Sequence, residues 1–138
     1  MLYNGPDKRL RTYSWFMIFM AVFFLTPLAA ELIWPAGLVW QDGRTNESVP
    51  WMLKAMYISL AICMVMGAKD PVRNVIIIDY AMISSIVHGL VMLWFAVKLH
   101  HEHAHLWGDV PMLLILAIVL FFYNPRRIAQ EKKEAEAS

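Results

Sequence analysis

The segment from Val75 to Val97 constrains this chain more than any other, because it is a long apolar run with only two ionisable side chains, Asp79 and His88. As an α-helix it would be about 35 Å long, at ~1.5 Å per residue. That length is enough to cross the ~30 Å hydrocarbon core of a bilayer. We therefore expect a membrane-spanning helix here, over about 71–99.

One side of this expected helix carries a stripe of small residues. Ala81, Ser85 and Gly89 are four residues apart and therefore share one helix face. Inside a membrane, small side chains let neighbouring backbones approach closely, and this close packing drives helix association. The stripe predicts the face on which another helix packs.

Three further apolar segments are expected to be helices, at about 13–34, 51–68 and 107–124. The first is longer than the ~7–15-residue apolar core of a signal peptide. The last contains an apolar run of 14 residues, Val110 to Tyr123, a length that also suits a re-entrant segment. We take it as a span, which predicts an all-α, integral membrane four-helix bundle in a single domain, 1–138, with a polar tail at 125–138.

The composition agrees with a membrane protein. Hydrophobic residues make up 59% of the 138 residues and charged residues 17%, whereas soluble domains have ~25% charged residues. A net charge of +1 lacks the basic excess typical of nucleic-acid binders, so we expect no nucleic-acid partner. The single cysteine, Cys63, excludes an internal disulfide.

The basic residues predict the orientation. Nine of the twelve Lys and Arg residues lie in segments that four spans place on one side: Lys8, Arg9, Arg11, Lys69, Arg73, Arg126, Arg127, Lys132 and Lys133. Arg44 lies in an opposite connection, 35–50, which Trp34, Trp40 and Trp51 flank as an aromatic belt. The positive-inside rule therefore places both termini in the cytoplasm and the histidine-rich connection outside.

Four polar side chains are expected in the outer half of the bilayer. Glu31, Lys54 and Asp109 lie near the outer ends of their helices, and His88 lies ~15 Å deeper than Val97. Charges inside a bilayer usually pair with one another. We predict a Glu31–Lys54 ion pair with His88 hydrogen-bonded near it. The alternative is a pair that only fixes helix packing or reaches the outer surface.

Asp79 is expected to be separate from this cluster. It lies nine positions from His88, which at ~100° per residue places the two on opposite helix faces. Lys69 or Arg73 is the expected partner of Asp79, or else another subunit. The alternative is a buried carboxylate that accepts hydrogen bonds at a helix end.

The connection before the last span contains four of the five histidines: His100, His101, His103 and His105. Imidazoles at this spacing suit copper or zinc, whether the segment is helical or extended. A solvated or pH-sensitive loop is the alternative interpretation, with Glu102 exposed beside the histidines.

Two motifs carry a resemblance to a known family. The stretches Ser84–Met92 and His105–Pro111, followed by Leu113 and Leu114, resemble a family of small bacterial four-helix membrane proteins known only as a domain of unknown function. The turn Trp34–Gly37 is similar to it as well, and the match covers about 8–127. The resemblance implies a fold distantly like the DoxX-type proteins, in a bacterial inner membrane. It also implies a shared role for His88, Gly89, His105, Gly108, Asp109 and Pro111.

We expect this chain to be a small accessory subunit that packs against a larger bacterial membrane complex of a respiratory or membrane-oxygenase type. Four short helices leave little interior for a pocket of their own, so the expected partners are lipids and other membrane subunits. One alternative is an extracytoplasmic copper- or zinc-binding protein that uses His100–His105. Another is a small DoxX-like oxidoreductase, which would need a quinone or haem pocket.

Overall fold

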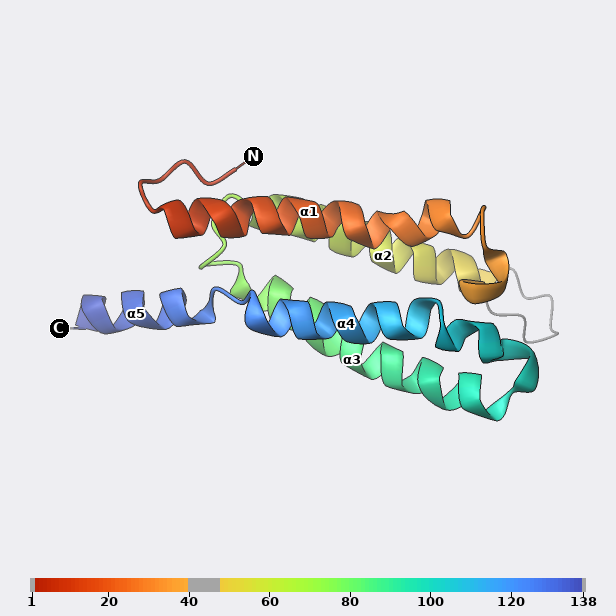
Figure 1. Ribbon diagram of the computed structural model, residues 1–138. Helices are drawn as coiled ribbons and strands as arrows, with labels where there is room; N and C mark the ends of the chain where they lie inside the picture. The colour runs from red at the N-terminus through yellow and green to blue at the C-terminus, as the bar shows by residue number, and fades with distance from the viewer. Residues whose placement is uncertain (1, 40–47, 138) are drawn as a thin grey trace.

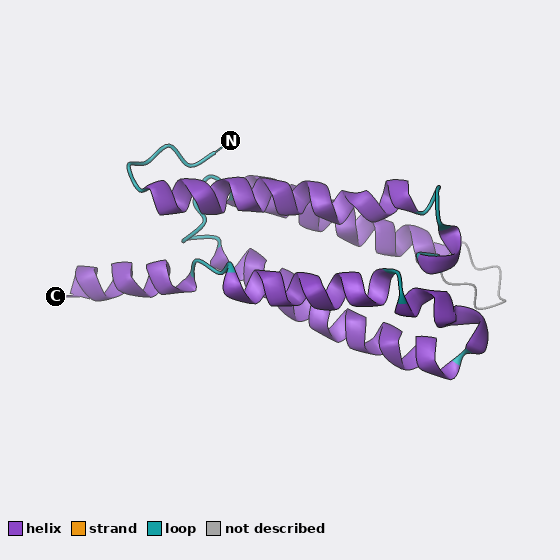
Figure 2. Ribbon diagram, viewed as in Figure 1, coloured by secondary structure: helices purple, strands orange, loops and turns teal. Residues whose placement is uncertain are grey.

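The computed structural model describes residues 2–39 and 48–137. Its elements are α1 (Lys8–Ala30), η1 (Pro35–Gly37), α2 (Ser48–Gly67), α3 (Val75–Lys98), η2 (His100–Leu106), α4 (Asp109–Phe122) and α5 (Arg126–Ala137), where η marks a short 3-10 helix. The described residues contain helices and connections but no strand, which confirms the all-α fold (Figure 2). Most of the expected connection 35–50, including Trp40 and Arg44, lies outside the described residues.

Two antiparallel hairpins build the bundle. α1 packs mainly on α2, and α3 packs mainly on α4 (Figure 1). The chain begins and ends at the end of the bundle where α1 starts, which we call the termini end. At the opposite end, which we call the η2 end, η1 contacts η2.

The helix boundaries differ from the expected ones by a few residues, for local reasons. α1 begins at Lys8 because Asp7 caps it, and its Oδ1 accepts a hydrogen bond from the Arg9 N–H at 2.9 Å. α3 begins at Val75, since Pro71 to Asn74 form a turn. The polar tail continues as α5, which is mostly exposed.

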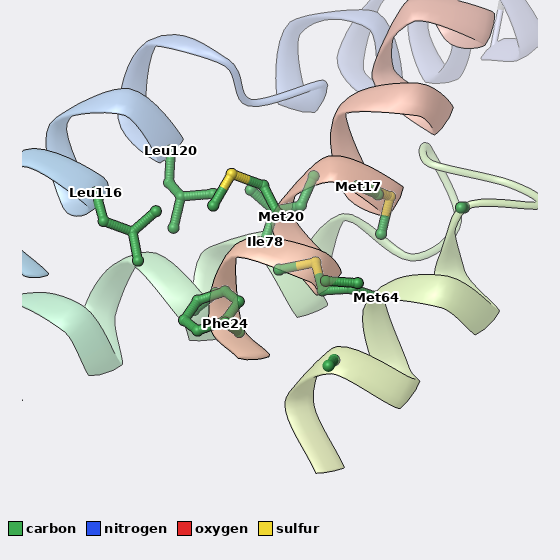
Figure 3. Close-up of a cluster of buried hydrophobic side chains, with 11 residues drawn as sticks. Met17, Met20, Phe24, Met64, Ile78, Leu116 and Leu120 are labelled. Carbon is green, nitrogen blue, oxygen red and sulfur yellow. The ribbon is translucent and has the colours of Figure 1, made fainter. Parts of the chain in front are cut away.

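The main hydrophobic core joins both hairpins. Figure 3 shows side chains from all four long helices meeting there: Met17, Met20 and Phe24 from α1, Met64 from α2, Ile78 from α3, and Leu116 and Leu120 from α4. Methionine fills irregular gaps between helices because its side chain is unbranched and flexible. A second core cluster, Met92, Ala96, Val110 and Leu113, joins only α3 and α4. The two hairpins are therefore held together mainly toward the termini end.

The small-residue stripe of α3 packs inside the chain. Ala81 is 0% exposed and Ser85 3%, and Gly89 is also buried. A Cβ atom built on Gly89 would lie 3.0 Å from Leu114 Cδ2 and 3.4 Å from Leu113 Cβ. The stripe thus lets α4 approach α3 closely, and it is covered by this chain rather than open to another protein.

Among the described residues, three helical stretches are long and apolar enough to cross a membrane, by length and composition: Lys8–Ala30, Val75–Lys98 and a stretch within His100–Ala135. Within the last stretch α4 has only 14 residues, and η2 precedes it. The second expected span is a shorter apolar helix, Trp51–Gly67. These lengths and compositions are compatible with a membrane helix bundle.

Candidate functional site

A buried group of ionisable side chains lies at the η2 end. Glu102 is 2% exposed, His105 0% and Asp109 6%. Glu102 and His105 come from η2, and Asp109 is the first residue of α4. We call these three residues the η2 cluster.

His105 lies between the two carboxylates of this cluster. Its Nδ1 is 3.0 Å from both Oδ1 and Oδ2 of Asp109, and its Nε2 is 3.1 Å from Oε2 of Glu102. Residues three apart align along a 3-10 helix, which places Glu102 beside His105. On the other side of Glu102, Oε1 is 3.6 Å from Nε2 of His101, whose side chain is 58% exposed. The η2 cluster is therefore connected to the surface through one histidine.

The chemistry of this arrangement is proton binding. The His105 imidazole is hydrogen-bonded to Asp109 through Nδ1, and its Nε2 lies beside Glu102. Histidine and carboxylate pairs are also the groups that most often pass protons as general acids and bases. The η2 cluster thus brings three groups of this kind together in a buried place.

Three rings, separate from the contacts of the η2 cluster, stack on one another along the bundle. The Tyr57 ring stacks on His88 with centroids 6.4 Å apart and planes at 8°. Tyr57 also stacks on Phe24 at 6.2 Å and 24°. Tyr57 was not expected at the site, because an aromatic residue in an apolar run does not differ in sequence from a core residue.

The expected ion pair between the first two helices is present. Lys54 Nζ lies 2.6 Å from Glu31 Oε1, and both side chains are about one-fifth exposed, at 21% and 18%. Lys54 also lies over the Trp51 ring, 4.6 Å from its centroid. The expectation for His88 is corrected, since its contact is with Tyr57 in place of this pair. The four polar residues expected as one cluster therefore lie in three places: Glu31 with Lys54, His88 beside Tyr57, and Asp109 in the η2 cluster.

The expected partners of Asp79 are also corrected. Its Oδ1 accepts a hydrogen bond from Asn124 Nδ2 at 2.8 Å, and its Oδ2 lies 2.5 Å from a guanidinium nitrogen of Arg126. Lys69 and Arg73 are close in sequence, but α4 runs antiparallel to α3 and returns the chain to the start of α3. Asn124 and Arg126, which follow α4 in the chain, therefore lie next to Asp79.

The four histidines do not form one metal site. His100 and His103 contact each other edge to face, with ring centroids 4.9 Å apart, whereas His105 is turned into the η2 cluster. Three residues per turn align His100 with His103 but not with His105. Within residues 2–39 and 48–137, no group of three or more His, Cys, Asp or Glu side chains is arranged to hold a metal ion. Glu102, expected in a solvated loop, is instead almost fully buried.

Fold and site together define a small all-α bundle of apolar helices with a buried acid–histidine cluster at one end. The chain matches the family of unknown function DUF6632 over residues 5–134, and it belongs to that family. This confirms the resemblance to a family known only as a domain of unknown function. No curated protein and no solved structure matches the chain.

Proposed function

We propose that this chain is an integral protein of the bacterial cytoplasmic membrane that acts as an accessory subunit, packing against a larger membrane protein complex. Its membrane part consists of the four helices α1 to α4. Its partners are membrane lipids and the helices of that complex, of a respiratory or membrane-oxygenase type.

The observation that carries this proposal is how little of each apolar helix the chain itself covers. Only 28% of the apolar stretch of α1 and 33% of that of α3 is buried within the chain. The remaining apolar surface needs lipid or other helices around it, because water would solvate it poorly. A small bundle whose helices expose wide apolar faces is well suited to pack against larger membrane subunits.

The distribution of charge supports an orientation with both termini in the cytoplasm. Lys8, Arg9 and Arg11 lie in the first turn of α1, and Arg126 and Arg127 begin α5, at the same end of the bundle (Figure 1). The connection between α2 and α3 is at this end as well, since Ser14 Oγ donates a hydrogen bond to the Ala68 carbonyl at 2.6 Å. Basic residues gathered at one end favour that end on the cytoplasmic side. The η2 end then faces outward.

One exposed face of α1 suits a protein neighbour. Trp15, Phe19 and Val22 are 56%, 63% and 60% exposed, and their spacing of four and three residues places them on one side of the helix. Large aromatic side chains are enriched in the contacts between proteins. We assign this face to the contact with the larger complex.

The first experiment measures the chain as purified from native membranes in a mild detergent. One sample is analysed for the mass of the intact complex and for metal content. The proposal expects a complex much larger than 16.0 kDa, with this chain in a fixed ratio to other subunits. A free chain would overturn it, and a free chain with stoichiometric copper or zinc would establish metal binding instead.

A pair of variants tests the assigned face. Trp15→Ala combined with Phe19→Ala is expected to release the chain from the complex. The matched control is Ile83→Ala combined with Val87→Ala, which alters side chains of α3 that are similarly exposed, at 55% and 57%. If the control releases the chain and the α1 variant does not, the contact is on α3 and the assignment is wrong.

A further inference from the structure

We propose that a groove between α3 and α4 binds one acyl chain of an anionic phospholipid, whose phosphate lies at Arg126 and Arg127. The groove is lined by apolar side chains, and the two arginines follow α4 in the chain, at the termini end. The hydrocarbon chain and the headgroup of such a lipid therefore each meet matching chemistry. This proposal rests on the membrane location proposed above, but it does not depend on the accessory role.

The groove has a volume of about 540 Å³. Met82 and Ile86 line it from α3, and Phe121 and Phe122 are among the residues that line it from α4. Ala117 of α4 also lines it, and because this side chain ends at Cβ, it leaves space that a larger residue would fill. Every side chain that lines the groove is apolar, so the groove suits a hydrocarbon chain and not a polar molecule.

The length of the groove fits a chain within one leaflet of a bilayer. On α4 its lining runs from Leu114 to Phe122, which is about 12 Å at ~1.5 Å per residue. The hydrocarbon part of one leaflet is about 15 Å thick, half of the ~30 Å core of a bilayer. An acyl chain that enters from the termini end therefore stays in contact with the groove over most of its leaflet.

Asp79 holds Arg126 at the termini end of the groove. Asp79 comes three residues before Met82 and seven before Ile86, a spacing that places all three on one side of α3. Its Oδ2 lies 2.5 Å from Nη2 of Arg126, whose side chain is nevertheless 61% exposed. A guanidinium carries five N–H donors, so one that contacts a carboxylate through Nη2 can bind a phosphate as well.

Arg127 adds the charge that selects an anionic headgroup. It is exposed and directly follows Arg126, whose charge is balanced by Asp79. The three side chains together carry a net positive charge. A zwitterionic headgroup has a cation beside its phosphate, whereas an anionic one does not. Basic residues at the cytoplasmic ends of membrane helices attract anionic headgroups.

Tyr123 lies between the groove and the arginines in the chain. It is the C-terminal cap of α4, and its side chain is 54% exposed. Tyrosine is enriched where the hydrocarbon of a membrane meets the headgroups, because its ring is apolar and its hydroxyl polar. The order Phe122, Tyr123, Arg126 therefore matches the order of hydrocarbon, interface and phosphate in a phospholipid leaflet.

The test is native mass spectrometry of the full chain in a mild detergent, with added phosphatidylglycerol or phosphatidylcholine of the same acyl chains. The proposal expects wild type to bind phosphatidylglycerol at least about fivefold more tightly than phosphatidylcholine. Arg127→Gln leaves the contact of Asp79 with Arg126 in place and should lose most of this preference. The matched control is Arg11→Gln, which removes the same charge from an exposed side chain at the same end, on α1, and should keep the preference.

Two results would overturn the proposal. One is wild type that binds the two lipids equally, and the other is an equal loss of preference in Arg127→Gln and Arg11→Gln, which would assign the effect to overall charge. Failure of the membrane location is a different result, because the chain would then remain in solution without detergent and retain neither lipid.

A second measurement locates the acyl chain and needs no variant. The chain is placed in nanodiscs that contain phosphatidylglycerol with a photoreactive diazirine in one acyl chain, and the cross-linked residues are identified by mass spectrometry. The proposal expects Ile118, Phe121 and Phe122 of the groove to be labelled several times more strongly than Ile83 and Val87, which are 55% and 57% exposed on α3. Even labelling of both sets would mean ordinary contact with surrounding lipid and would also contradict the proposal.

Discussion

His105 Nδ1 lies 3.0 Å from both carboxylate oxygens of Asp109, across the junction where η2 passes into α4. Both residues are buried, and Glu102 approaches the imidazole from the other side. The contact holds η2, a helix of seven residues, against the first turn of α4. The η2 end therefore has a buried polar contact beside the apolar cluster of Met92, Ala96, Val110 and Leu113.

Replacing this histidine should destabilise the fold. In His105→Ala two buried carboxylates lose the imidazole that lies between them, and we expect a loss of about 2 kcal/mol in the free energy of unfolding. The measurement is reversible unfolding in detergent, followed by circular dichroism. His103→Ala, which changes an exposed side chain, should stay within about 0.5 kcal/mol of wild type. Equal stability of the two variants would show that the η2 cluster does not stabilise the fold.

The contact of Asp79 with Arg126 and Asn124 should connect α5 to the bundle. Arg126→Ala leaves a buried carboxylate with one partner fewer, and we expect a loss of about 1–3 kcal/mol because the arginine itself is 61% exposed. A double-mutant cycle with Asp79→Asn measures the coupling. A coupling energy near zero would mean that the ion pair does not stabilise the fold. Lys69→Ala, at the partner expected from sequence, serves as the control.

A side chain at position 89 should fit only if α4 moves away from α3. The added methyl of Gly89→Ala would lie 3.0 Å from Leu114 Cδ2, which is tighter than an ordinary contact. We expect a loss of about 1 kcal/mol for Gly89→Ala and about 1–3 kcal/mol for Gly89→Leu. Combining Gly89→Ala with Leu114→Ala should recover part of the first loss. No recovery would place the strain elsewhere in the helix pair.

Ser14 should contribute to the contact between α1 and the turn after α2. Its hydroxyl donates to the Ala68 carbonyl at 2.6 Å and accepts from the Tyr3 N–H at 3.0 Å. Ser14→Ala removes both bonds in a buried position, and we expect a loss of about 1–2 kcal/mol. Thr12→Ala removes an exposed bond within one helix and should change stability much less. A loss of similar size in both variants would contradict this assignment.

The N-terminal cap of α1 should depend on pH. Partial desolvation raises the pKa of Asp7, but hydrogen bonds from Arg9 and Leu10 and the charge of Arg9 outweigh it and lower the pKa below its usual value. A carboxyl with a lowered pKa in the folded state stabilises the fold above its unfolded pKa, and this stability is lost as the pH falls through the folded pKa. Below about pH 4 the start of α1 should fray, as backbone amide exchange would detect. In Asp7→Asn this pH dependence should disappear.

The sequence alone was sufficient to predict the four long helices, α1 to α4, because their determinants are local. The apolar run from Val75 to Val97, its stripe of small residues and the position of Glu31 relative to Lys54 can all be placed from helical rise and periodicity. The boundaries differ where a single residue decides them, as Asp7 does for α1.

The tertiary structure alone decided which polar groups meet. Asp79 pairs with a residue 47 positions later, and Tyr57 stacks on His88 across two helices. Glu102 is buried because η2 contacts α3, α4 and η1, although its neighbours in sequence are exposed histidines. Burial and pairing depend on what covers a side chain in space. That covering comes from segments distant in the chain, which periodicity and spacing along one helix do not specify.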